Sequence, residues 1–231
     1  MRFRKLLFDA DGTLWDFNAS ARLSIANGFK RRGYDYSEAV YERYEVINKS
    51  LWERYERGEM PRDRVLVERF ELLFAELGIR EDAAAFENEF RQGLEENPIW
   101  MEGAENLLRR LRPDYEIYIV TNGVASTQRR RIALTGLDHY VDDVFISEEI
   151  GAQKPQGAFF DYVLSHIAPC ELQELLLIGD SLSADILGAN QAKSPSCWFN
   201  PERLPLTGSA RPDYEIHALP ELMAVLNIKS S

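Results

Sequence analysis

The segment LLFDADGT (residues 6–13) places two carboxylates, Asp9 and Asp11, directly after a short apolar run. In an extended backbone, residues i and i+2 point the same way, so both carboxylates are expected to reach into one site beyond the end of a strand. Two like charges this close repel each other, and they need a cation or a shared proton between them. The segment therefore favours a metal-assisted site, although a turn that closes a strand also uses Asp and Gly.

Three further apolar runs in the chain also lead into polar side chains. The runs end at residues 120, 147 and 178, and the polar residues that follow them are Thr121, Asn122, Lys154, Asp180 and Asp185. Short apolar runs separated by helical stretches are typical of buried parallel strands, and such sheets bind ligands beyond the carboxyl ends of their strands. We therefore expect an α/β fold with a doubly wound parallel sheet and a site at that end of it.

The chain changes character between the first and second of these polar segments. Residues 15–97 carry no strand signal, and their apolar residues recur at helical spacing between Gly and Pro residues that end helices. The expected helices cover residues 19–32, 37–57, 61–77 and 81–95, with Ser37 as a cap of the second. We predict a helical-bundle domain over 15–97, inserted into an α/β core made of 1–14 and 98–231.

The composition of the chain narrows the classes of partner that it is expected to bind. The chain has 231 residues and a net charge of −11, which argues against a nucleic acid polymer or an anionic membrane surface as partner. No apolar segment approaches the roughly 20 residues that span a bilayer, and we expect a soluble cytoplasmic protein. Cys170 and Cys197 are expected to be free thiols. The three histidines, His139, His166 and His217, form neither a catalytic triad nor a zinc pattern.

The polar segments, taken in order, resemble the motifs of the haloacid dehalogenase (HAD) superfamily. The segments are Asp-x-Asp-Gly-Thr (9–13), Thr-Asn-Gly (121–123), Lys-Pro (154–155) and Gly-Asp-Ser-x-x-x-Asp (179–185). The match covers most of the chain. It implies a HAD-like, Rossmann-type core with a helical cap domain, which closes over the core site and selects the substrate.

The resemblance also implies a reaction. In the superfamily's phosphatases, the residue that matches Asp9 is a nucleophile that forms an aspartyl phosphate, and the residue that matches Asp11 is the general acid and base. Mg²⁺ is then held by Asp9, by the backbone carbonyl of Asp11 and by Asp180, with Asp185 behind them. We expect a phosphomonoester hydrolase.

The remaining motif residues are implied to meet the phosphoryl group. Lys154 neutralises charge there, while Thr121 and Asn122 donate hydrogen bonds to its oxygens. Ser181 has a plainer interpretation, as the N-cap of the helix after Asp180.

Asp11 bears on the class of reaction. Dehalogenases of the superfamily lack an acid at this position, whereas its phosphatases and phosphomutases carry one. A mutase similar to β-phosphoglucomutase therefore stays open. A phosphoacceptor signalling module of the receiver type is a further alternative, but it is about half this length and lacks a helical insertion.

The cap region adds a narrower resemblance. Residues 46–52, together with 120–123 and 146–151, are similar to the bacterial noncanonical pyrimidine nucleotidases. The resemblance implies a 5'-nucleotidase whose partner is a small phosphorylated metabolite, a pyrimidine nucleoside monophosphate, with Asn48 and Lys49 as candidate contacts. Hydrolysis of phosphoglycolate or of a sugar phosphate remains an alternative. The sequence leaves open whether the chain is a monomer or a homodimer.

Overall fold

The computed structural model describes residues 2–227, which form two compact units. One unit contains the chain up to Phe17 together with the chain from Ile99 onward, and the other runs from Asn18 to Pro98. We expected the boundaries after residues 14 and 97. Trp15 belongs to the first unit, where it is fully buried and its ring centroid lies 4.5 Å from that of Trp100.

The first unit is built on one parallel sheet. Within the described residues its strand order is β3-β2-β1-β4-β5-β6, and the strands are β1 (Lys5–Phe8), β2 (Glu116–Thr121), β3 (Asp143–Ile146), β4 (Leu175–Gly179), β5 (Ser196–Phe199) and β6 (Tyr214–Ile216). The predicted α/β fold with a parallel sheet is confirmed. We did not anticipate β5 and β6, which are short and lie at one edge.

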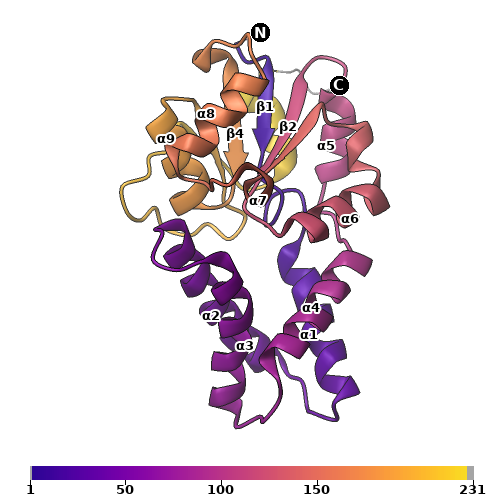
Figure 1. Cartoon of the computed structure of the whole chain (residues 1–231). Coiled ribbons are helices and arrows are strands. Elements are labelled where there is room, and N and C mark those ends of the chain that lie inside the picture. Colours follow the sequence, from indigo (N-terminus) through magenta and orange to yellow (C-terminus); the bar gives the residue numbers. More distant parts are fainter. Residues whose placement is uncertain (1, 228–231) are drawn as a thin grey trace. The chain divides into compact units, whose positions relative to one another are not determined.

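Helices cover both faces of this sheet (Figure 1). They are α5 (Ala104–Leu111), α6 (Ala125–Thr135), α7 (Ser147–Ile150), α8 (Gly157–His166), α9 (Leu187–Ala192) and α10 (Leu222–Val225). We expected residue 147 at the end of a strand, but it begins α7.

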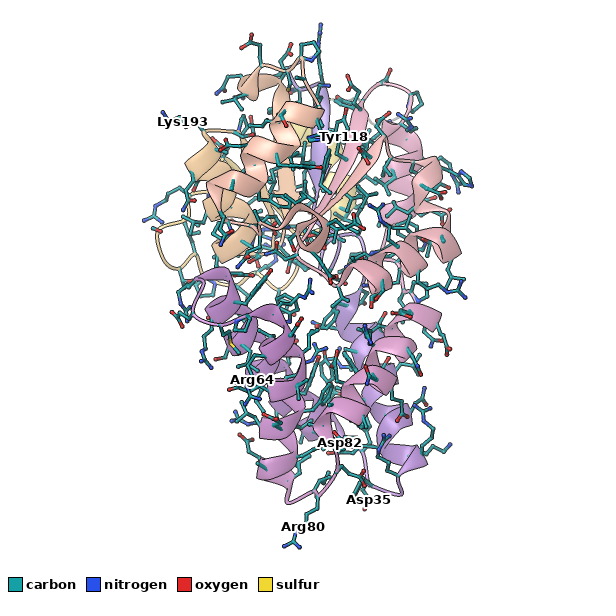
Figure 2. The ribbon with its side chains drawn as sticks, in the orientation of Figure 1. Asp35, Arg64, Arg80, Asp82, Tyr118 and Lys193 are labelled. Atoms are coloured by element: carbon teal, nitrogen blue, oxygen red, sulfur yellow. The ribbon has the colours of Figure 1, made fainter. Side chains whose placement is uncertain are left out.

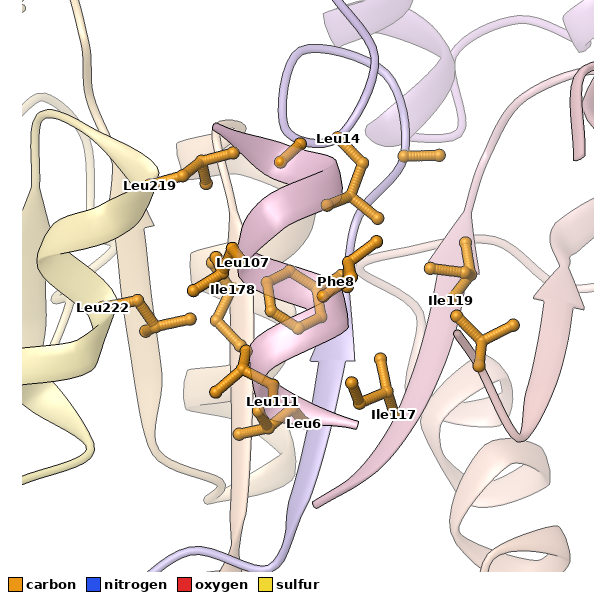
Figure 3. Close-up of a cluster of buried hydrophobic side chains, with 14 of the residues drawn as sticks. Leu6, Phe8, Leu14, Leu107, Leu111, Ile117, Ile119, Ile178, Leu219 and Leu222 are labelled. Atoms are coloured by element: carbon orange, nitrogen blue, oxygen red, sulfur yellow. The ribbon is translucent and has the colours of Figure 1, made fainter. Parts of the chain in front are cut away.

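Alternate residues of β1 enter different hydrophobic clusters. Leu6 and Phe8 of β1 pack in one cluster with α5 and with Leu222 (Figure 3), whereas Leu7 packs in another cluster with α8. Because both faces are covered, Leu6, Leu7 and Phe8 are all apolar instead of alternating with polar residues. Burial of each of these side chains contributes about 1.5–3 kcal/mol, and the buried strands fix the positions of the residues that follow them.

The second unit is a bundle of the four predicted helices. They are α1 (Phe17–Arg31), α2 (Glu38–Glu56), α3 (Arg62–Leu77) and α4 (Ala83–Glu96). The side chain of Asp82 (Figure 2) caps α4 by accepting hydrogen bonds from the backbone N–H groups of Ala84 and Ala85. Ser37 lies at the predicted N-cap position of α2, but its side chain makes no cap hydrogen bond. The predicted position is therefore right, and the predicted side-chain cap is wrong.

Aromatic rings fill the interior of the bundle. The buried rings are Phe29, Tyr41, Tyr44, Tyr55, Phe70, Phe74, Phe86 and Phe90. Neighbouring centroids lie as close as 4.8 Å, between Phe70 and Phe86. The aromatic residues at helical spacing on α2 therefore belong largely to the core of this unit.

Two further expectations concern cysteines and membranes. Cys170 and Cys197 are free thiols. None of the helices within residues 2–227 combines the length and the apolar character that a membrane span requires.

Candidate active site

The ends of β1 and β4 bring two aspartates to the same end of the sheet. Asp9 follows β1 and Asp180 follows β4, and these strands are paired in parallel. The Asp9 N–H donates to the carbonyl of Ile178 at 2.9 Å, which extends the ladder up to the site. Gly12 adopts a φ of +87°, and a Cβ there would lie 2.5 Å from Asp180 Oδ2, so only glycine lets the turn approach this carboxylate.

Lys154 is anchored among the carboxylates by three hydrogen bonds. Its Nζ donates to Asp9 Oδ1 and Asp185 Oδ1, each at 2.6 Å, and to the carbonyl of Val120 at 2.8 Å. These bonds use all three N–H groups of the ammonium. Lys154 is 1 % exposed and Asp185 is fully buried, so this charge pairing takes place out of contact with water.

The cluster holds three acids and one ammonium group, and the pKa values of Asp9 and Asp180 are raised there. Carboxylate oxygens of Asp9, Asp180 and Asp185 lie within 4.8 Å of one another. Burial first, and then the neighbouring Asp185, raise the pKa of Asp180 to about 7. Burial also raises the pKa of Asp9 well above its usual range, with Lys154 acting against this and the other two carboxylates adding to it.

This donor set fits a hard divalent cation. Oxygen ligands held close together, with more negative charge than Lys154 offsets, are what Mg²⁺ prefers. Thr13 Oγ1 donates to Asp180 Oδ1 at 3.2 Å, and Trp198 Nε1 donates to the Asp180 carbonyl at 2.9 Å, which fixes the orientation of this acid.

Asp11 is not part of that group of three carboxylates. Its Oδ1 accepts from Arg131 Nη1 at 2.5 Å, and its Oδ2 accepts from Gln128 Nε2. We had not singled out these two residues of α6. They lie 117 and 120 positions from Asp11, and the one hint in the sequence is their spacing, which places both on one helix face.

The side chains of Thr121 and Asn122, the two predicted phosphoryl ligands after β2, differ in how many of their hydrogen-bonding groups are already used. Thr121 Oγ1 accepts from the Gly123 N–H at 3.0 Å and keeps its own proton to donate. Asn122 bonds the main chain of Lys154 with both ends of its amide, accepting from N–H and donating to the carbonyl, each at 2.9 Å. Asn122 therefore holds Lys154 in place, and contact of its side chain with substrate stays a prediction.

Asn48 and Lys49 lie on α2 of the helical unit. Asn48 Oδ1 accepts from Arg69 Nη1 at 3.0 Å and from the Tyr44 hydroxyl at 3.4 Å, whereas Lys49 is exposed. In the core unit, Ser181 is the predicted N-cap, since its Oγ accepts from the Ala184 N–H at 3.1 Å.

The family of the chain follows from comparison with known proteins. The model of the haloacid dehalogenase-like hydrolases matches residues 4–193, which include all four motifs. The chain belongs to this family. The predicted superfamily and the prediction of a hydrolase are confirmed.

Relatives of this HAD hydrolase align over nearly its whole length. It is 39% identical to the HAD-hydrolase YfnB of Bacillus subtilis, over 100% of this chain and 98% of that protein. A crystal structure of YfnB, described as bound to magnesium and revealing interdomain movement, matches with a TM-score of 0.93 over 99% of this chain and 100% of that one.

The predicted resemblance to pyrimidine nucleotidases is also confirmed. The HAD hydrolase is 34% identical to the pyrimidine 5'-nucleotidase PynA of Streptococcus pneumoniae, over 98% of this chain and 96% of that protein. It is 30% identical to the pyrimidine 5'-nucleotidase YjjG of Escherichia coli, over 98% and 99% of the two chains.

Proposed function

We propose that this chain is a phosphoric monoester hydrolase that removes the 5'-phosphate of pyrimidine nucleoside monophosphates. The observation that carries the reaction is the group of three carboxylates around buried Lys154, which presents Asp9 as an oriented nucleophile. The similarity to PynA and YjjG, both named pyrimidine 5'-nucleotidases, supports the substrate class.

In the first step, Asp9 attacks phosphorus through a carboxylate oxygen. The bond from phosphorus to the ester oxygen breaks, its electron pair stays on that oxygen, and the oxygen takes a proton from the Asp11 carboxyl. The product is an aspartyl phosphate at Asp9. Lys154, which donates a hydrogen bond to Asp9 Oδ1, offsets the negative charge that develops on the phosphoryl group.

In the second step, Asp11 takes a proton from water, and the water oxygen attacks phosphorus. The bond to Asp9 breaks and its electron pair returns to that carboxylate, which releases inorganic phosphate and restores both aspartates. Thr121 can donate its hydroxyl proton to a phosphoryl oxygen in both steps.

A divalent cation would be held by Asp9, the backbone carbonyl of Asp11 and Asp180, with Asp185 fixed behind them by Lys154. When bound, it neutralises the carboxylates and the transferred phosphoryl group.

The orientation of Asn48 favours a ligand rich in acceptors. Arg69 is a donor only, so its hydrogen bond fixes the amide with Oδ1 toward Arg69 and leaves Nδ2 as a donor. Lys49 on the same helix is a second donor. The carbonyl oxygens of a pyrimidine base are acceptors of the kind that either of these donors binds.

A substrate panel tests this proposal. We expect pyrimidine nucleoside monophosphates to lead phosphoglycolate, hexose phosphates and purine nucleotides in kcat/KM. Lys49→Ala removes a charged donor worth about 1.5–3 kcal/mol, so kcat/KM for the pyrimidine nucleotides should fall roughly 10- to 100-fold. Hydrolysis of p-nitrophenyl phosphate, which lacks the base, should not change.

Lys30→Ala is the matched control, since Lys30 is an exposed lysine of the same unit on α1. We expect it to behave as the wild type on every ester. A panel led by phosphoglycolate or by a sugar phosphate, or an equal loss on all esters in Lys49→Ala, would contradict the nucleotidase proposal while leaving the phosphatase chemistry in place.

A further inference from the structure

The carboxylate of Asp11 is held at both oxygens by side chains of α6. Arg131 binds Oδ1 at 2.5 Å, and Gln128 binds Oδ2. The steps proposed above make no use of either donor. We refer to Gln128 and Arg131 together as the Asp11 clamp.

Packing alone does not account for Arg131. The residue is 1 % exposed, and its Nε and Nη2 have no hydrogen-bond partner among the described residues. Unpaired buried donors are destabilising, and an apolar side chain of similar size would avoid that loss. The guanidinium lies over the ring of Trp15 with its Cζ 5.1 Å from the centroid, which directs it at Asp11.

Gln128 reaches Asp11 because Gly123 leaves room for it. A Cβ at residue 123 would lie 2.3 Å from Gln128 Nε2. Gly123 belongs to the turn between β2 and α6, next to Thr121 and Asn122, so the backbone that carries predicted phosphoryl ligands also admits the clamp. The Oε1 of Gln128 is buried and unpartnered in the described structure, so the one hydrogen bond the structure gives this amide is to Asp11.

We propose that Gln128 and Arg131 are positioning residues that set where the Asp11 carboxylate stands during catalysis. This inference rests on the proposed function, in which Asp11 gives a proton to the ester oxygen and later takes one from water. A carboxylate bound at both oxygens is restrained in rotation and translation, and accurate placement of an acid or base is worth much of its effect. Asp9 is held separately, by Lys154.

The two steps should therefore respond differently to loss of the clamp. A p-nitrophenyl ester releases a stable phenolate, so attack by Asp9 and loss of the phenolate electron pair need no proton from Asp11. The hydrolysis of the aspartyl phosphate still needs Asp11 to take the proton of the attacking water. An alkyl ester needs Asp11 in both steps.

The test is rapid-mixing kinetics of Arg131→Met and of Gln128→Met with p-nitrophenyl phosphate. The rate of the first burst of p-nitrophenol should stay within about threefold of wild type, while steady-state turnover falls at least ~10-fold, because general base catalysis is worth ~10²–10⁴. Phosphoenzyme should accumulate. Arg131→Lys, which keeps a charged donor, should recover part of the turnover. Gln128→Met leaves no charged group buried without a partner, so it provides the test if Arg131→Met does not fold.

Arg130→Met is the matched control, an exposed arginine on the same helix that should behave as the wild type. The double variant Asp11→Asn/Arg131→Met should be no slower than Asp11→Asn alone, since the clamp acts through Asp11. Additive losses, or burst and turnover reduced equally in both clamp variants, would overturn the inference. An Asp11→Asn variant with wild-type turnover would instead overturn the proposed function on which the inference rests.

Discussion

Each unit of this molecule buries a charged cluster, and the two clusters differ in balance. In the helical unit, Arg69 faces one carboxylate, Glu87, at 2.7 Å, and it also donates to the hydroxyl of Tyr44 at 3.1 Å. In the α/β unit, Lys154 faces two carboxylates at 2.6 Å, and Asp180 completes a group of three acids. The first cluster is even, with one acid for one base, and the second is uneven, with three acids for one base.

The difference is the basis on which we propose a structural role for the first cluster and a functional role for the second. The Arg69 guanidinium lies over the ring of Phe90 with Cζ 4.7 Å from the centroid, so the ion pair is part of the aromatic core. Folding alone gives no reason to gather three acids beside one buried lysine, because desolvation of the carboxylates opposes it. We therefore propose that the uneven cluster at the strand ends is the one that a cation and a phosphoryl group complete.

The largest effect should come from Asp9→Asn. We expect turnover of p-nitrophenyl phosphate to fall at least ~10⁴-fold, because the substitution removes the nucleophile and a cation ligand together. Thermal unfolding should occur at the same temperature or higher, since one like charge leaves the cluster. Turnover near the wild-type rate would contradict the assignment of the nucleophile.

Substitution in the even cluster, Arg69 and Glu87, should instead lower the stability of the fold. Arg69→Met leaves Glu87 buried without its partner and should lower the free energy of unfolding by about 3–5 kcal/mol. The double variant Arg69→Met/Glu87→Leu should recover most of this loss. Urea denaturation measures both, and a single variant as stable as wild type would show that the pair is not structural.

The smallest effects should come from the two helix caps, one in each unit. Asp82→Ala and Ser181→Ala each remove a side-chain acceptor at a helix start, and each should lower the free energy of unfolding by about 0.5–2 kcal/mol. Asp82→Ala should leave turnover of p-nitrophenyl phosphate unchanged. A loss of turnover in Asp82→Ala would show that the helical unit takes part in the chemistry itself.

The parts of the fold that were predictable are those with local signals. Apolar runs that end in acids identified β1 and β4. Helical periodicity that ends at a glycine identified α3, and that glycine, Gly78, adopts the left-handed conformation. The strands β5 and β6, with the sequences SCWF and YEI, were missed because they are short and no motif residue of the site follows them.

The parts of the site that were not predictable depend on contacts between distant segments. Gln128 and Arg131 meet Asp11 only because the fold brings α6 beside the end of β1, and no local motif requires such a contact. The two hydrogen bonds between Asn122 and the Lys154 main chain are of the same kind. Sequence motifs identified the residue types that chemistry needs, whereas the residues that hold them in place appear once the chain is folded.

Binding of Mg²⁺ tests most directly that the uneven cluster is a cation site. Chain freed of metal with EDTA should not hydrolyse p-nitrophenyl phosphate, and Mg²⁺ should restore activity with a binding isotherm measurable by calorimetry. Asp180→Asn should weaken that binding by more than ~10-fold, because even outer ligands contribute 10- to 100-fold to metal affinity, whereas Arg69→Met/Glu87→Leu should bind as the wild type does. Activity that survives exhaustive chelation, or equal Mg²⁺ affinity in Asp180→Asn, would contradict a cation at this cluster.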